Sequence, residues 1–166
     1  AKALSALLGN WQAGGIITQQ SGQPFTANIN TDRANNGLGL LGYGRPNLVG
    51  NPNLPGDQQT PERWFNTDAF VLQPVGSLGT AGRNILTGPG TNIVDFSLLK
   101  NIPLNERHRL QFRTEFFNFF NKTNFDFPER ICTVAVTGAP CAGGTFGRVT
   151  AARDPRILQF GLKFLF

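Results

Sequence analysis

Few side chains in this sequence have the type and spacing that catalysis requires. Glu62, Asp68, Glu115 and Asp126 are the carboxylates that a glycoside hydrolase would need as a pair. They are scattered over predicted strands and loops, as carboxylates are in most proteins, so a catalytic pair is not indicated. The only histidine, His108, lies between two arginines, and no Ser or Cys has a base spaced to activate it. We therefore expect no enzymatic activity and no cofactor.

Two sets of loop residues approach ligand-binding motifs without matching them. The first has the glycine content of a phosphate loop: Gly79, Gly82, Gly88 and Gly90. No Gly-Lys-Ser/Thr follows it, so these glycines are better interpreted as turn residues. The second offers oxygen ligands for Ca²⁺: Asn30, Asp32, Asn35 and Asn36. Its spacing differs from that of an EF-hand, and solvated loop residues are the simpler interpretation, so no metal site is predicted.

Composition and charge favour a secreted or envelope β protein. Gly and Pro are abundant, charged residues make up 15%, and the formal net charge is +5. The basic residues are scattered and belong to no reading motif, so we expect no nucleic-acid binding, and contact with anionic lipopolysaccharide is the milder interpretation. Methionine is absent. The chain is therefore expected to begin at a processed or internal site.

The final residues, Arg156 to Phe166, show the clearest local pattern. Apolar and mostly polar side chains alternate, and a period of two predicts a β-strand. The apolar face of this strand holds Leu158, Phe160, Leu162, Phe164 and Phe166. An apolar stripe that continues to an aromatic end is typical of the closing strand of a bacterial outer-membrane barrel. The length also agrees with the roughly 9 to 11 tilted residues that cross a bilayer.

Three further strands are predicted, and the connections between the four differ greatly in length. The strands span about 10–20, 92–102, 108–120 and 156–166, with long loops over 21–91 and 121–155 and a short turn near Pro103. Long loops that alternate with short turns fit a membrane barrel, in which extracellular loops are long and periplasmic turns short. The predicted fold class is therefore all-β, with about four antiparallel barrel strands and two long extracellular loops.

The second and third strands are predicted to form an antiparallel hairpin with one apolar face. That face would hold Val94, Phe96, Leu98, Leu110, Phe112 and Phe116. A hairpin centred near Leu104 would also place Asp95 opposite Arg113, giving a cross-strand ion pair of roughly 0.2 to 1 kcal/mol. The phenylalanines from Phe116 to Phe127 would form an aromatic girdle at the outer end of the third strand.

Several segments in a consistent order resemble the C-terminal end of TonB-dependent receptor-like proteins, particularly their Oar-like branch. They are NWQAGGIITQQSGQPFT (10–26), RPNLVG (45–50), RWFNTDAF (63–70), GTAGRNILTGPG (79–90), DFSLLKNIPL (95–104), LQFRTEFFNFFNKTNF (110–125) and DPRILQFGLKFLF (154–166). The resemblance implies a bacterial outer-membrane barrel of about 22 strands with an N-terminal plug, opened by an energised periplasmic TonB-type partner. This chain contains neither the plug nor the partner-binding box.

In a receptor of this kind, lumen-facing polar residues and extracellular loops define the route of the ligand, whereas apolar residues face lipid. The residues expected to face the lumen are Asp95, Gln111, Arg113, Glu115 and Lys163. The loop residues proposed as ligand contacts are Arg45, Trp64, Phe65 and Arg83. A structural role remains open for both sets: a charge ladder on the strands, and packing of the loop on itself. The substrate is not evident from the sequence.

Four strands are too few to close a barrel, because the smallest single-chain examples use about eight. Open edges in lipid would leave backbone donors and acceptors unsatisfied at several kcal/mol each. Either the rest of a larger polypeptide completes the barrel, or copies of this chain pair through their free edges. Outside a membrane, the same edges would drive assembly into a fibre or tube, which is the alternative function.

The two cysteines, Cys132 and Cys141, lie in the second predicted loop. A metal site would require additional Cys or His ligands, and the sequence offers only His108. In an exported loop this pair predicts a disulfide. Closing so short a ring is expected to stabilise the ordered loop tip by roughly 2.5 to 3 kcal/mol.

Overall fold

The computed structural model describes residues 8–37, 44–133, 136–141 and 144–166. The chain divides into two compact units: unit 1 comprises residues 1–20, 91–124 and 153–166, and unit 2 comprises residues 21–90 and 125–152. The four long strands all belong to unit 1. Their bounds are β1 (Trp11–Gln20), β7 (Thr91–Pro103), β8 (Arg109–Phe117) and β10 (Ile157–Leu165).

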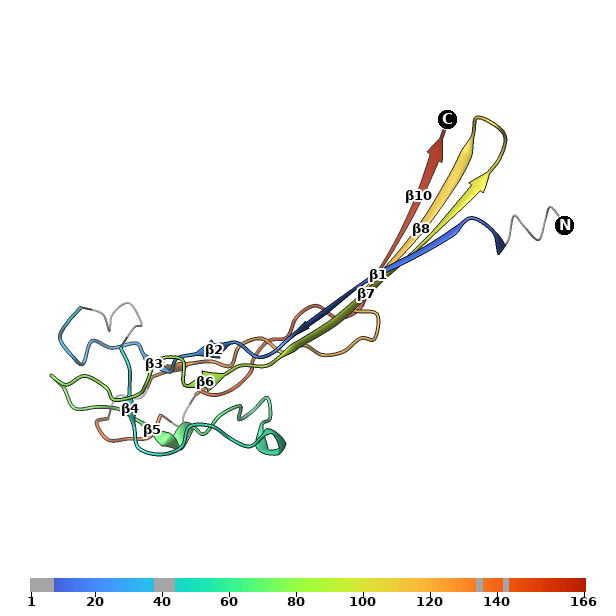
Figure 1. The fold of residues 1–166 in the computed structure, drawn as a ribbon. Coiled ribbons are helices and arrows are strands. Elements are labelled where there is room, and N and C mark those ends of the chain that lie inside the picture. Colours follow the sequence, from blue (N-terminus) through green and yellow to red (C-terminus); the bar gives the residue numbers. More distant parts are fainter. Residues whose placement is uncertain (1–7, 38–43, 134–135, 142–143) are drawn as a thin grey trace. The chain divides into compact units, whose positions relative to one another are not determined.

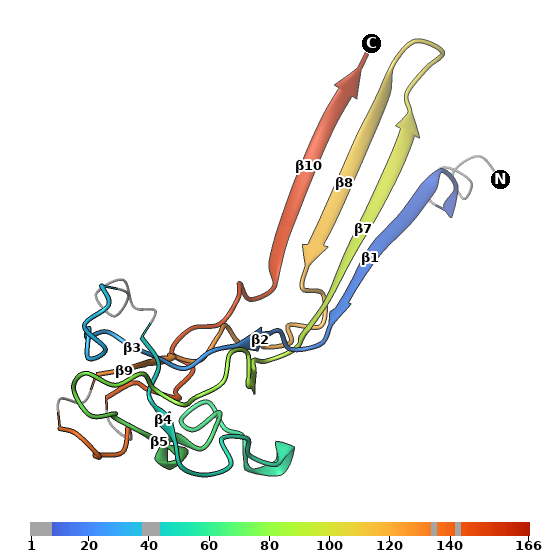
Figure 2. The same ribbon diagram turned by 60° about the vertical axis from the view of Figure 1, so that its left-hand side comes forward.

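The long strands form one antiparallel sheet in the order β1-β7-β8-β10, which is visible in Figures 1 and 2. Both expected features, the all-β fold class and the antiparallel pairing, are confirmed. Within the described residues β1 and β10 each have only one neighbouring strand, so each leaves one edge unpaired. Among the same residues no helix is long and apolar enough to cross a lipid bilayer.

The register gives the sheet two different faces. Directly paired residues point to the same side of a sheet, so the pairs Phe96↔Phe116 and Phe112↔Leu162 define one face and Gln111↔Lys163 defines the other. We call the first the apolar face; its side chains are Trp11, Ala13, Ile17, Gln19, Asn92, Val94, Phe96, Leu98, Lys100, Ile102, Leu110, Phe112, Thr114, Phe116, Leu158, Phe160, Leu162 and Phe164. The prediction that the β7–β8 hairpin keeps its large apolar side chains together is therefore confirmed.

The predicted ion pair between Asp95 and Arg113 is wrong, because the hairpin turns later than expected. Arg113 lies opposite Leu99, and the pairing continues to Pro103↔Arg109. Asn105 stabilises the turn: its Oδ1 accepts hydrogen bonds from the backbone N–H groups of Arg107 and His108, at 3.0 and 2.7 Å. The register differs from the predicted one by an even number of residues, so the faces are preserved although the partners change.

Strand β8 ends at Phe117, earlier than predicted, because Asn118 adopts a left-handed backbone conformation with φ 49°. Its side chain closes the turn by accepting a hydrogen bond from the N–H of Lys122 at 3.0 Å and donating to the carbonyl of the same residue at 2.9 Å. Asparagine tolerates this region better than other non-glycine residues. Phe119 consequently lies in a turn, where its ring still contacts Phe96 and Phe116 at 5.6 and 5.5 Å.

Unit 2 is built from the two segments that were predicted as loops. Its strands have two residues each: β2 (Pro24–Phe25), β3 (Asn28–Ile29), β4 (Asn47–Leu48), β5 (Phe70–Val71), β6 (Leu86–Thr87) and β9 (Ile131–Cys132). They pair as β2-β6, β3-β9 and β4-β5, and two 3-10 helices, η2 (Gly56–Gln58) and η3 (Thr67–Ala69), lie between β4 and β5. The β3-β9 pair is parallel and joins the first segment to the second.

The core of unit 2 is aromatic. Phe65, Phe70 and Phe146 make mutual edge contacts with ring centroids 5.1 to 5.8 Å apart, and each ring is at most 4% exposed. Edge contacts of this kind add about 0.5 to 1.5 kcal/mol beyond the burial of area. The predicted loops therefore pack into a unit with its own hydrophobic core. Phe125 and Phe127, predicted as girdle residues, belong to this unit and contact Trp64 and Phe25 instead.

The predicted disulfide is present. Cys132 and Cys141 are bonded, with Cα atoms 5.3 Å apart, and both are 1% exposed within the core of unit 2. The bond thus crosses the packed centre of the unit, whereas the sequence suggested an exposed loop tip. The N–H of Cys141 also donates to the carbonyl of Phe70 at 2.8 Å, which ties the cross-link to β5.

Candidate functional site

The five strand residues expected to face the lumen lie together on the second face of the sheet, which we call the polar face. The register places Asp95, Gln111, Arg113, Glu115 and Lys163 on that face. Gln12, Thr18, Ser97, Asn101 and Gln159 share it with a minority of apolar residues, Ile16 and Leu99 among them. That this face borders a lumen stays a prediction.

Hydrogen bonds organise the polar face locally. Arg113 forms an ion pair with Glu115 of the same strand, and Gln111 Nε2 donates to Asn101 Oδ1 on β7 at 3.0 Å. Asp95 Oδ1 accepts the backbone N–H that follows β8 at 2.9 Å. The Arg113 side chain is 56% exposed, so its ion pair contributes little to stability, about 0 to 1 kcal/mol. These charges therefore remain accessible to a solute beside the sheet.

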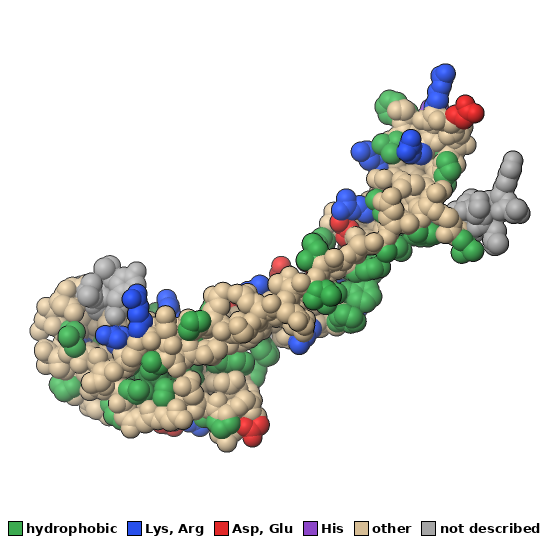
Figure 3. Space-filling model, viewed as in Figure 1, with side chains coloured by type: hydrophobic (Ala, Val, Ile, Leu, Met, Phe, Trp, Pro, Cys, Tyr) green, Lys and Arg blue, Asp and Glu red, His purple; other side chains and the backbone are tan. Residues whose placement is uncertain are grey.

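The apolar face has no cover within the described residues. Ile17 is 71% exposed, Phe160 63% and Leu162 69%. Figure 3 shows apolar side chains along the strands and charged side chains near the end that carries the β7–β8 turn. Withdrawing each large apolar side chain from water contributes about 1.5 to 3 kcal/mol. The face is thus suited to contact with lipid or with another apolar protein surface.

Lys100, a polar residue of the apolar face, lies on β7 opposite Trp11, the first residue of β1. Lys100 is 5% exposed, and its Nζ lies 4.8 Å from the ring centroid of Trp11 and donates to the carbonyl of Gly9. A cation over an indole ring is a favourable contact, and Trp is enriched at membrane interfaces. The Lys100 charge is therefore compatible with an interfacial position.

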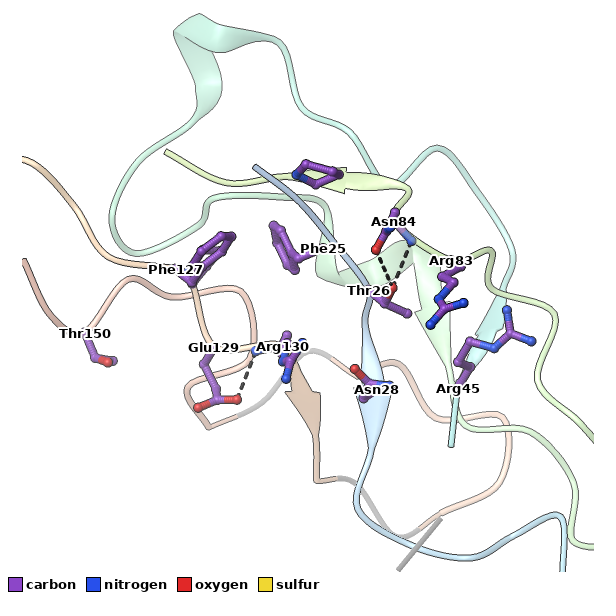
Figure 4. Close-up of a pocket in the computed structure, with 12 residues that line it drawn as sticks. Phe25, Thr26, Asn28, Arg45, Arg83, Asn84, Phe127, Glu129, Arg130 and Thr150 are labelled. Carbon is purple, nitrogen blue, oxygen red and sulfur yellow. Dashed lines mark hydrogen bonds between the residues drawn. The ribbon is translucent and has the colours of Figure 1, made fainter. Parts of the chain in front are cut away.

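Unit 2 contains a cavity of about 950 Å³. Figure 4 shows its lining: Phe25 and Phe127 lie on one side, Arg130 lies beside Phe25 and Glu129, and Arg45 and Arg83 lie together farther away in this view. The remaining lining residues are Pro24, Thr26, Asn28, Asn84, Pro128, Glu129 and Thr150. Small-molecule sites typically measure about 300 to 1,000 Å³, so this cavity has the size of a ligand site.

The four loop residues proposed as ligand contacts have different positions in unit 2. Arg45 and Arg83 both line the cavity. Phe65 is 2% exposed and packs in the core, where a ligand does not reach it. Trp64 is half-buried, donates from Nε1 to the carbonyl of Thr87 at 2.9 Å and contacts the ring of Phe125. Of this set, the two arginines line the cavity, and their contact with a ligand stays a prediction.

Sequence reasoning missed the third cavity arginine, Arg130, and the aromatic wall formed by Phe25 and Phe127. Arg130 reaches the cavity because β9 pairs with β3, and the N–H of Asn28 donates to the carbonyl of Arg130 at 2.8 Å. Strands of two residues carry no detectable periodicity. The only sequence feature near Arg130 is Pro128-Glu129, which follows a segment rich in aromatic residues. This feature indicates a turn and does not indicate a binding residue.

The candidate catalytic and metal-binding residues have other contacts. Asp68 pairs with Arg63 at 3.1 Å, and His108 Nδ1 lies 2.9 Å from Asn105 Oδ1. The carboxylate of Asp32 accepts two backbone N–H groups of its own loop, at 3.1 and 2.8 Å. Across the part of the chain that the structure describes, no three His, Cys, Asp or Glu side chains cluster as a metal site. The absence of enzymatic activity stays a prediction.

The sequence matches a known protein family. A family model described as an outer membrane beta barrel domain matches residues 1–159. The searches of curated proteins and of solved structures found no match.

Proposed function

Because this chain belongs to the outer membrane beta barrel domain family, we propose that it forms part of a TonB-dependent receptor-like barrel that captures a ligand for uptake across the outer membrane. The family itself points to a barrel-type role in the bacterial outer membrane. The finer assignment rests on the ordered sequence resemblance to TonB-dependent receptors. In this proposal the energising partner is a periplasmic TonB-type protein, and the remaining strands of the same barrel are the immediate neighbours.

The observation that carries the proposal is the difference between the two faces of the sheet. The apolar face continues across all four strands without interruption by an acidic residue, whereas Asp95 and Glu115 lie on the polar face. A bilayer outside and an aqueous lumen inside require this division in a transmembrane barrel. In the part of the chain that the structure describes, β1 and β10 each leave one edge unpaired, and in this proposal further strands continue the barrel there.

Fluorescence quenching by lipid tests which face meets the bilayer. In a background with Trp11→Phe and Trp64→Phe, which removes both native tryptophans, Leu162→Trp and Lys163→Trp place the single indole of the chain on adjacent residues of β10 that point to opposite faces. In vesicles made with lipids brominated on their acyl chains, Leu162→Trp should be quenched strongly and Lys163→Trp only weakly. Aqueous iodide should give the reverse order. Equal quenching of the two variants by brominated lipid would refute the membrane assignment.

A cross-linking experiment addresses the energising partner. Formaldehyde treatment of cells that express the intact receptor should link it to the TonB-type protein. The yield should increase when ligand is present, because ligand occupancy is the signal that recruits the partner in the proposed mechanism. A receptor that is never cross-linked while fully inserted would contradict the TonB-dependent part of the proposal and leave the barrel itself standing.

The unpaired edges of β1 and β10 also support one alternative, self-assembly into a fibre or tube. Copies of the chain would then pair edge to edge and cover the apolar face with protein. Particles that grow in buffer without detergent, measured by light scattering, would favour this alternative. A species of constant size that requires detergent to stay dispersed would favour the barrel.

A further inference from the structure

We infer that the cavity of unit 2 binds a small organic anion with an aromatic or otherwise apolar body. This inference rests on the proposed function and gives its ligand a chemical class. It is drawn from the cavity alone: an excess of positive charge in the lining, aromatic rings on one side, and a volume of about 950 Å³.

The charges of the cavity are unbalanced. Arg45, Arg83 and Arg130 line it together with a single carboxylate, that of Glu129. Glu129 Oε1 already accepts hydrogen bonds from the backbone N–H groups of Arg130 and Ile131, at 2.9 and 3.0 Å. Among the described residues no ion pair joins Glu129 to an arginine side chain. The guanidinium groups therefore keep their attraction for an external anion.

The guanidinium groups also keep donors for a ligand. Arg45 uses Nη1 to donate to the carbonyl of Ala81 at 2.9 Å, which fixes the side chain and leaves its other nitrogen donors. Arg83 and Arg130 form no side-chain hydrogen bond or ion pair with any residue that the structure describes. A planar guanidinium presents donors in a fork that matches a carboxylate, and such charge-assisted bonds are roughly twice as strong as neutral ones.

The aromatic side of the cavity is suited to an apolar group. Phe25 and Phe127 meet edge to face with centroids 5.7 Å apart, and Pro24 and Pro128 adjoin them. Phe127 is 50% exposed and Phe25 only 5%, so Phe127 offers most of the aromatic surface and Phe25 supports it from the core. An inorganic ion would use only the arginines, whereas an aromatic carboxylate would use the arginines and the rings. The geometry thus favours the organic anion.

Calorimetric titration with phthalate, which has a benzene ring and two carboxylates, tests the inference on the full chain in detergent micelles. Sulfate serves as the charged probe without a ring, and benzyl alcohol as the ring without a charge. Phthalate should bind at least ten times more tightly than either, and its affinity should fall as salt is raised. Equal affinity for sulfate and phthalate would overturn the role of the aromatic wall.

Two double variants of equal net charge separate the cavity from general attraction. Arg83→Gln with Arg130→Gln should weaken phthalate binding by roughly tenfold to a hundredfold for each arginine removed. Arg63→Gln with Arg148→Gln removes the same charge from unit 2 outside the cavity lining and should leave binding within about twofold. Equal losses in both double variants would overturn the inference.

If the glutamine variant fails to fold, judged by near-ultraviolet circular dichroism, phthalate binding is measured instead on the double variant Arg83→Lys with Arg130→Lys. Lysine keeps the charge and loses the fork, so binding should weaken several-fold, and unchanged binding would overturn the inference. This test is separable from that of the proposed function. Absence of phthalate binding, with the expected quenching of Leu162→Trp by brominated lipid, removes the ligand class only; the reverse result removes the membrane assignment only.

Discussion

Placing a positive charge on each face of β10 in turn is the most direct test of how this sheet meets a membrane. Phe160→Arg and Gln159→Arg add the same charge at adjacent residues near the middle of the strand. The register places Phe160 beside Thr114 on the apolar face and Gln159 beside Glu115 on the polar face. Length, net charge and strand position are therefore matched, and the variants differ in the face and in the side chain that is replaced.

The expected costs differ by several kcal/mol. Arginine on a lipid-facing site at the bilayer midplane costs about 2 to 4 kcal/mol. Loss of the phenylalanine adds about 1.5 to 3 kcal/mol, so Phe160→Arg should lower the free energy of unfolding by about 4 to 7 kcal/mol. Gln159→Arg introduces a charge opposite Glu115, which should change stability by at most about 1 kcal/mol, in the favourable direction.

Urea titration of the intact receptor in phospholipid vesicles, followed by the shift of the folded band in electrophoresis, measures both changes. At about 1.4 kcal/mol per factor of ten, Phe160→Arg should reduce the ratio of folded to unfolded protein by roughly a thousandfold or more. Recovery in the outer-membrane fraction of cells should fall in parallel. If the two variants lose the same stability, or if Gln159→Arg loses more, the assignment of the apolar face to lipid is refuted.

Three further changes test unit 2 and the end of β8. Replacing Cys132 and Cys141 with serine should remove about 2.5 to 3 kcal/mol from unit 2 alone, seen as faster hydrogen exchange in residues 125–152 with unchanged exchange in β7. Gly79→Ala places a Cβ 1.8 Å from the carbonyl oxygen of Arg45, so it should lower the melting temperature of unit 2 and weaken phthalate binding, whereas Gly56→Ala, with open space around its Cβ, should do neither. Asp95→Ala removes the acceptor for the N–H that follows β8 and should cost about 1 to 3 kcal/mol in urea titration; an unchanged midpoint would contradict that role.

The parts of the fold that follow from a period of two were predictable, and the parts that depend on a turn were not. Alternation along β10 identifies its two faces without any knowledge of its neighbours. The partner of Arg113, in contrast, depends on where the β7–β8 turn closes, and the side chain of Asn105 moves that point beyond Leu104. A shift by an even number of residues preserves every face and changes every partner.

The candidate site was predictable only where single residues indicated it. Arg45 and Arg83 stand out as charged residues in segments rich in Gly and Pro, and both line the cavity. Arg130 was missed because its position depends on the parallel β3-β9 pair, whose strands have two residues each. A phenylalanine can contact a ligand or pack in a core, and the residue type alone does not distinguish the two. The burial of Phe65 in the aromatic core depends on packing, which the local sequence does not encode.

The construction of unit 2 from two distant segments also determines the order in which the protein can fold. The β7–β8 hairpin needs only neighbouring residues, whereas the hydrogen bond from Arg33 to Thr137 joins residues 104 positions apart. Contacts between distant residues form slowly, because the entropy of closing the chain must be lost before the contact stabilises anything. Arg130, which belongs to the second segment, therefore joins Arg45 and Arg83 of the first segment late. A chain truncated after β8 would keep the residues of the hairpin and lack Arg130, the third arginine of the cavity.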